Sequence, residues 1–264
     1  SALSNPSTQD FIEWKKQKGH SVVVVTEDEV NLNSSSSIRN RITTEYTGED
    51  PVDFVLLIGD TDGSYSITSG GSQYDHYYSM IEGNDVLADV SVGRVSVDNS
   101  TQLSTVLNKI VGYESDPYMA NSSWLNRIGL TVGASACYLS MKTLSRNIAA
   151  EFVDKRSYTN IDTAYCANAG HVVNWYNEGL SFYNYRGWIG MEGLSINQIQ
   201  NLEQGPRTPV TVLFTCSTGD FNGGEDYVEY FLRAGSPATP GGGVCAMGFA
   251  TINTHTRYNN VVCG

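Results

Sequence analysis

The chain lacks any long run of apolar residues. No apolar stretch approaches the roughly 18 residues that a membrane-spanning helix needs, so we expect no membrane span. Charge is also scarce, because 17% of the 264 residues are charged, against about 25% in typical soluble domains. Basic residues are the scarcer kind: 16 Lys and Arg stand against 28 Asp and Glu, which gives a net charge of −12. Because an acidic surface repels phosphate groups, this balance argues against nucleic-acid and anionic-membrane partners.

Histidine and cysteine are also few. There are four His and five Cys, and an odd number of cysteines leaves at least one outside any pairing within the chain. Both ends are abrupt, without a signal peptide or a stop signal, which is typical of a mature form or of a piece cut from a larger protein. Ser, Thr, Asn, Gly and Tyr are abundant instead, as in many secreted proteins, so we expect an extracellular or cell-surface location.

Apolar runs that alternate with helical patterns predict an α/β fold. Strands are predicted at 21–26, 54–60, 87–94, 127–135, 180–186, 208–216 and 242–253. Helices are predicted at 8–18, 34–46, 100–114, 139–154, around 174 and at 226–234. Strands that are apolar throughout indicate mostly parallel sheets flanked by crossover helices. Pattern breaks near residue 118 divide the chain into two tandem subdomains, residues 1–118 and 119–264.

Ligands of such sheets bind beyond the carboxyl ends of the strands, which draws attention to Cys216. Cys216 ends the strongest predicted strand of the second half, and backbone N–H groups of the following turn would favour a thiolate or stabilise an oxyanion. A buried structural cysteine is the alternative. Gly187 ends the neighbouring predicted strand, where it indicates either a close backbone approach at the rim or an ordinary turn.

Several segments, in the same order along the whole chain, resemble those of the gingipains, which are cysteine peptidases with a caspase-like fold. The segments are 11–15 (FIEWK), 55–60 (VLLIGD), 81–85 (IEGND), 92–94 (VGR), 184–187 (NYRG), 216–221 (CSTGDF) and 250–253 (ATIN). The resemblance implies a caspase-like α/β fold with a catalytic second subdomain. It also implies protein or peptide substrates, Cys216 as the nucleophile, and N–H groups near Gly187 and Cys216 as oxyanion donors.

The chain departs from this pattern where the family has its base and its specificity residue. Trp188 occupies the position of the catalytic His that follows Asn-Tyr-x-Gly in the family. The acidic residue that orients that His would fall near Ser135 or Ala136, where the chain has no carboxylate. Met141 stands where the arginine-specific members have the Asp that reads the arginine side chain. We therefore expect no strict arginine preference, with Trp188, Met141 and Thr254 as candidate substrate-binding residues.

A thiol nucleophile needs a proton acceptor close by, and His255 is the candidate. His255 follows a predicted strand next to the strand that ends at Cys216, and neighbouring strands lie about 4.8 Å apart. The alternative is a polar histidine at the rim that bonds to Thr254, Thr256 or the backbone.

Asp85 and Asp89 form a second candidate site. The matching carboxylates hold calcium in the gingipains, and two carboxylates four residues apart in a turning segment can converge on one cation with backbone oxygens. A solvated acidic loop is the alternative. The sequence thus predicts a cysteine endopeptidase with structural calcium. The competing hypothesis is a catalytically inactive family member that acts as a peptide- or partner-binding, calcium-stabilised surface module. Rapid alkylation of Cys216 would distinguish the two.

Overall fold

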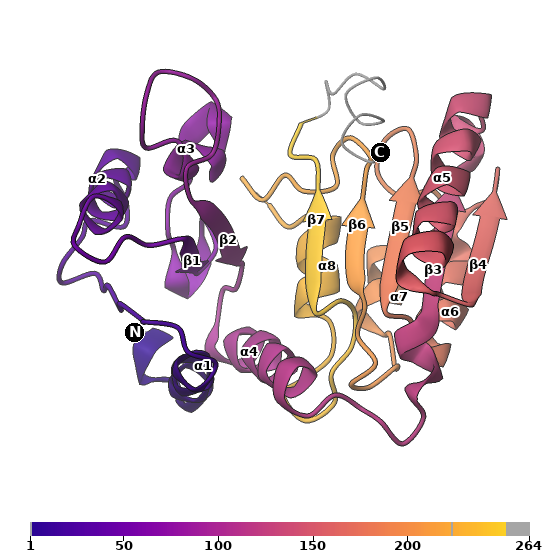
Figure 1. Cartoon of the computed structure of the whole chain (residues 1–264), viewed down its shortest axis with the longest axis horizontal. Coiled ribbons are helices and arrows are strands. Elements are labelled where there is room, and N and C mark those ends of the chain that lie inside the picture. The colour runs from indigo at the N-terminus through magenta and orange to yellow at the C-terminus, as the bar shows by residue number, and fades with distance from the viewer. Residues whose placement is uncertain (1, 223, 252–264) are drawn as a thin grey trace. The chain divides into compact units, whose positions relative to one another are not determined.

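The computed structural model describes residues 2–222 and 224–251. The chain divides into two compact units, which are Ser1–Ser104 with Phe221–Gly223, and Thr105–Asp220 with Gly224–Gly264 (Figure 1). The change from one unit to the other falls inside helix α4 (Ser100–Ser115), whereas the sequence pattern places a boundary after residue 118.

The first unit contains a small parallel sheet of β1 (Phe54–Ile58) and β2 (Ser91–Val95). Its α-helices in the described residues are α1 (Pro6–Gln17), α2 (Ser35–Tyr46) and α3 (His76–Ser79). Ser34 is the N-cap of α2, and its hydroxyl accepts the N–H of Ser37 at 3.3 Å and satisfies one donor of the first turn. The helix buries Ile38 and Ile42 in a cluster with Leu57 of β1.

The strand predicted at 21–26 is wrong. These residues form no strand, and Val23 and Val24 are exposed rather than buried on both faces. Val25 packs partly against the core of this unit. A β-branched run favours extended backbone, but a strand also needs a partner for its N–H and C=O groups, which sequence propensity does not supply.

The second unit is a five-stranded parallel sheet in the order β4-β3-β5-β6-β7. The strands are β3 (Arg127–Val132), β4 (Asn160–Tyr165), β5 (Phe182–Arg186), β6 (Val210–Leu213) and β7 (Cys245–Gly248). The connecting helices are α5 (Leu139–Arg156), α6 (Val172–Glu178), α7 (Ile196–Gln200) and α8 (Tyr227–Arg233). Helix α5 covers one face, and α6, α7 and α8 cover the other (Figure 1).

Aromatic side chains fill the core beneath α6, α7 and α8. Tyr183 and Tyr185 of β5 are fully buried there with Tyr176 of α6 and Phe231 of α8. The Tyr176 hydroxyl lies 2.7 Å from the Thr211 hydroxyl, and burial raises the pKa of Tyr176 well above its ordinary value. These tyrosines therefore support the sheet as neutral core residues.

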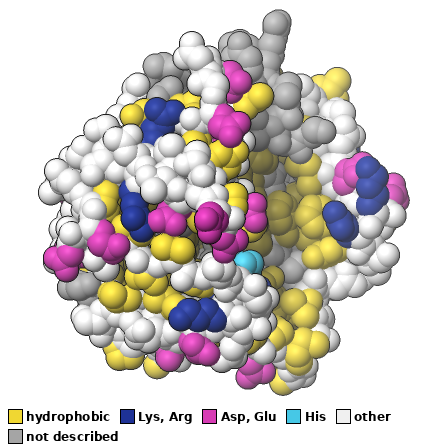
Figure 2. Space-filling view, turned by 60° about the vertical axis from the view of Figure 1, so that its left-hand side comes forward, with side chains coloured by type: hydrophobic (Ala, Val, Ile, Leu, Met, Phe, Trp, Pro, Cys, Tyr) yellow, Lys and Arg dark blue, Asp and Glu magenta, His cyan; other side chains and the backbone are white. Residues whose placement is uncertain are grey.

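Charged side chains are sparse on the surface shown in Figure 2, as the 17% of charged residues in the sequence leads us to expect. Figure 2 shows one face, on which carboxylates and basic side chains form small scattered groups among uncharged side chains. Among the described residues, no helix is both long enough and apolar enough to cross a membrane.

Candidate active site

The backbone segments that follow β5 and β6 run side by side beyond the ends of the two strands. The Phe214 N–H donates to the Tyr185 carbonyl at 3.0 Å. The Gly187 N–H donates to the Thr215 hydroxyl at 2.7 Å, and the Gly190 N–H donates to the Cys216 carbonyl at 2.9 Å. The structure thus brings the segment around Gly187 next to Cys216 at the carboxyl edge of the sheet.

Cys216 lies at the start of a sharp turn. Strand β6 ends at Leu213, and Cys216 is 7% exposed. Ser217 has a φ of 53°, in the left-handed region that non-glycine residues rarely adopt. The Thr218 hydroxyl closes the turn, because it lies 2.7 Å from the Thr215 carbonyl and 3.1 Å from the Leu213 carbonyl. A strained turn at a strand end is typical of functional sites.

The turn packs against the segment after β7, which occupies its N–H groups. Ser217 donates to the Thr251 carbonyl at 3.4 Å, while Thr218 and Gly219 donate to the Phe249 carbonyl at 3.2 and 3.1 Å. The Gly187 N–H is also engaged, with Thr215. A substrate oxyanion would therefore have to compete with protein acceptors for these donors, and the oxyanion role of Gly187 stays a prediction.

The residues beside Cys216 present apolar surface. Trp188, at the position of the family's histidine, is 54% exposed, and Ile189 is 52% exposed. Ile189 pairs with Cys216 in an isolated parallel bridge, so the backbone of this segment adjoins the backbone at Cys216. Trp188 is thus accessible to a substrate. Met141 is 1% exposed in the first turn of α5, and its predicted substrate contact stays a prediction.

A carboxylate does lie at Ser135, although the local sequence has none. The Ser135 N–H donates to Glu192 Oε2 at 3.0 Å, and the Ser135 hydroxyl also bonds to this carboxylate. Glu192 follows β5, and its N–H donates to the Tyr185 hydroxyl at 3.1 Å. A disulfide between Cys137 and Cys166 ties the same loop to the residue after β4. The loop after β3 is therefore held on two sides.

The proposed base falls beyond the described part of the chain. His255 and Thr254 both lie outside the described residues. His171 belongs to the second unit and has its Nε2 3.0 Å from the Thr131 hydroxyl, with its ring 4.3 Å from the Trp175 ring. Burial lowers the pKa of His171, which favours the neutral form in this structural role.

The candidate calcium residues belong to the first unit and are oriented by backbone donors. Asp89 Oδ2 accepts the N–H groups of Ile81 at 2.6 Å and Glu82 at 2.8 Å. Asp85 Oδ1 accepts the N–H of Leu87 at 2.9 Å. These bonds fix both carboxylates within the loop that leads to β2.

A different trio of carboxylates comes together after β1 and β2. Oxygen atoms of Asp60, Asp62 and Asp98 lie within 4.8 Å of one another. Asp60 also accepts the Thr61 N–H at 2.7 Å. Asp60 is buried, Asp62 is exposed and Asp98 is half-buried, and the cluster carries no assignment.

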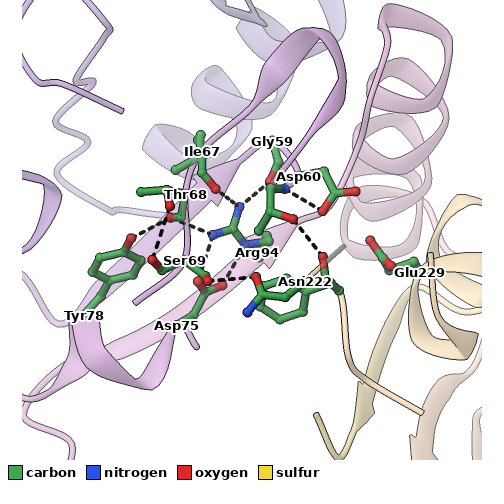
Figure 3. A network of polar contacts seen from close by, with 12 residues as sticks. Gly59, Asp60, Ile67, Thr68, Ser69, Asp75, Tyr78, Arg94, Asn222 and Glu229 are labelled. Carbon is green, nitrogen blue, oxygen red and sulfur yellow. Dashed lines mark hydrogen bonds and ion pairs between the residues drawn. The ribbon is translucent and has the colours of Figure 1, made fainter. Parts of the chain in front are cut away.

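A partly buried ion pair in the first unit lies beside residues 221 and 222, which belong to the same unit (Figure 3). Arg94 binds both oxygens of Asp75, at 2.7 and 2.8 Å. The Arg94 guanidinium also lies over the ring of Phe221, at 5.2 Å from its centre. The Phe221 carbonyl accepts the Thr61 hydroxyl at 2.8 Å, and Asn222 accepts the Ser69 hydroxyl at 2.8 Å. Phe221, the last residue of the CSTGDF segment, thus packs within the first unit.

Comparison with known proteins gives consistent matches. The model of peptidase family C25 matches residues 3–262. Gingipain R2 of Porphyromonas gingivalis strain W83 is 26% identical over 260 residues, which cover 93% of this chain and 35% of that protein. Gingipain R1 of Porphyromonas gingivalis is also 26% identical over 260 residues, covering 93% of this chain and 26% of that protein. The chain therefore spans about a third or less of the length of these relatives.

Solved structures match the fold. The crystal structure of the Arg-specific cysteine proteinase gingipain R (RGPB) superposes with a TM-score of 0.81 and 23% identity, over 96% of this chain and 63% of that one. The complex of the Porphyromonas gingivalis RgpB pro- and mature domains gives a TM-score of 0.80 and 22% identity, over 97% and 65%. The predicted caspase-like α/β fold, with mostly parallel sheets flanked by helices, is confirmed.

Proposed function

We propose, from the premise that the chain belongs to peptidase family C25, that it is a cysteine endopeptidase with Cys216 as nucleophile. The observation that carries the proposal is the position of Cys216, on a sharp turn at the carboxyl edge of the sheet and beside the exposed Trp188 and Ile189. The Cys216 thiolate would attack the substrate carbonyl carbon, and the amine would leave with a proton to give an acyl-enzyme. Water would then attack the thioester and release the acid and the thiol.

His255 is the proposed general base. The Ser217 N–H donates to the carbonyl of Thr251, which is the last described residue, and His255 follows four residues later in the sequence. Replacing His255 with Ala should abolish turnover while leaving a folded protein. Undiminished turnover in this variant would remove His255 from the mechanism.

The substrate is a protein or peptide, and we propose no strict arginine preference. Met141 stands where the arginine-reading carboxylate would be, and it is buried. The exposed Trp188 and Ile189 would contact apolar substrate atoms next to the scissile bond. An extracellular or cell-surface location is also part of the proposal, because the Cys137–Cys166 disulfide is typical of oxidising compartments.

Structural calcium in the loop of residues 82–89 is proposed as well. Carboxylate and carbonyl oxygens are the ligands that calcium prefers, and Asp85 and Asp89 offer carboxylates that backbone N–H groups already orient. Calcium should raise the midpoint of thermal unfolding of the wild-type protein, and Asp85→Asn should remove most of that rise. An unfolding midpoint that is insensitive to calcium and chelator would contradict the assignment.

Cleavage of a mixed peptide library tests the peptidase proposal. The wild-type chain, Cys216→Ala and Cys245→Ala are compared in calcium buffer, and Cys245, on β7, is the matched control because it is the other free cysteine among the described residues. Cleavage should vanish with Cys216→Ala and persist with Cys245→Ala, and the products reveal the residue preference. Failure of all three to cleave, in the full-length protein too, would favour the inactive peptide-binding hypothesis.

A further inference from the structure

Arg186 is a buried cation directly before Gly187, at the end of β5. It is 2% exposed and is the third residue of the NYRG segment. Its Nη1 group donates to the carbonyl of Gly187 at 2.7 Å and to the carbonyl of Phe214 at 2.8 Å. One guanidinium therefore bridges the ends of two neighbouring strands.

Three hydrogen bonds join the end of β5 and the segment that follows it to the segment that follows β6, and the bond from Arg186 is the first of them. The bond from Arg186 to Phe214 is followed by the bond from the Gly187 N–H to the Thr215 hydroxyl, and then by the bond from the Gly190 N–H to the Cys216 carbonyl. A buried guanidinium needs acceptors in a fixed geometry, and its planar fork loses little entropy on forming several bonds. Arg186 is thus suited to hold both segments in one register.

We propose that Arg186 is a positioning residue for the Cys216 site. It fixes the segment 187–190 against the segment 214–216, so that Trp188 and Ile189 keep a constant relation to the thiol. The side chain acts through the backbone of both segments and touches no substrate. The catalytic part of this inference rests on the proposed peptidase function, whereas the structural part does not.

Arg186→Lys tests the inference, because an ammonium keeps the charge but loses the planar fork. Arg207→Lys is the matched control. Arg207 donates to the carbonyls of Gln204, Glu178 and Asn177 at 3.1, 2.8 and 2.9 Å, but it precedes β6 and so lies at the opposite end of that strand from Cys216.

Two measurements are made on each variant. Hydrogen exchange of the Gly187 and Gly190 amides should become at least about tenfold faster in Arg186→Lys and stay unchanged in Arg207→Lys. The value of kcat should fall by about tenfold or more in Arg186→Lys, with KM within about twofold, since a misplaced nucleophile slows chemistry more than binding. If Arg186→Lys does not fold, Arg186→Gln, which keeps two N–H donors, is measured in the same way.

Unchanged exchange at Gly187 and Gly190 in the Arg186 variant would overturn the inference, whatever the peptidase activity. Equal acceleration by Arg207→Lys would also overturn it, because the effect would then be a general loss of stability. Absence of Cys216-dependent cleavage by the wild-type protein refutes the proposed function instead, and the exchange measurement still decides whether Arg186 positions the site.

Discussion

Gly219 offers a direct test of how tightly the Cys216 turn is packed. It lies three residues after Cys216, and a Cβ added there would stand 2.8 Å from the carbonyl carbon and oxygen of Gly248 at the end of β7. These are backbone atoms that cannot rotate away, so Gly219→Ala must push the turn away from the sheet.

The magnitude follows from the same contact. Overpacking of a well-packed site costs about 1–3 kcal/mol, which we expect as the loss in free energy of unfolding for Gly219→Ala. Displacement of a nucleophile by about 1 Å costs on the order of 10²-fold in rate, so kcat/KM should fall by about that factor.

Gly112→Ala is the matched control. Gly112 lies within α4, and an added Cβ there would meet nothing within 4 Å. Because Ala favours a helix over Gly, this variant should gain about 0.5–1 kcal/mol with unchanged kcat/KM. Urea unfolding and peptide cleavage are measured on both variants. A Gly219→Ala protein as stable as the wild type would refute the packing argument. A destabilised Gly219→Ala protein with unchanged kcat/KM would show that displacing this turn does not affect catalysis by Cys216.

Two further predictions concern the second unit. Lys109 is buried and donates to three backbone carbonyls between residues 232 and 241, and burial lowers the pKa of Lys109 from 10.5 to about 7. Between these values the unfolded chain binds more protons, so the free energy of unfolding should rise with pH by up to about 1.4 kcal/mol per unit. In urea unfolding at a series of pH values, the free energy of unfolding of Lys109→Met should rise less with pH than that of the wild type. An equal rise in both proteins would contradict this prediction. Replacing both Cys137 and Cys166 with Ser should cost roughly 3–4 kcal/mol, and a wild-type unfolding midpoint unaffected by reductant would argue against the bond.

Much of the fold was predictable because the helix-capping residues and the apolar patterns in the sequence agree with the packing in the structure. Ser34 caps α2 as its type favours, and Asp226 with Glu229 forms a capping box at the start of α8. Strand β4 was missed because its sequence, NIDTAY, mixes polar residues at a sheet edge where no apolar run is needed. The false strand at 21–26 has the apolar run, but within the described part of the chain it joins neither sheet.

The site was predictable only in part. The approach of Gly187 to Cys216 follows from parallel strands that end at the same edge. The carboxylate of Glu192 at Ser135 was not foreseeable, because 57 residues separate the two and only the fold joins them. Burial of Met141 was missed because its position was inferred from resemblance, whereas its side chain packs inward from α5.

Labelling by a peptidyl acyloxymethyl ketone tests the central claim most directly. This reagent reacts with activated thiols in a peptide-binding site, and Cys245, a free cysteine whose pKa is raised by burial of the thiol, is an internal control. The account predicts one adduct, located on Cys216 by peptide mass mapping and absent from Cys216→Ala. Labelling of Cys245 at the same rate, or no labelling of Cys216, would contradict it.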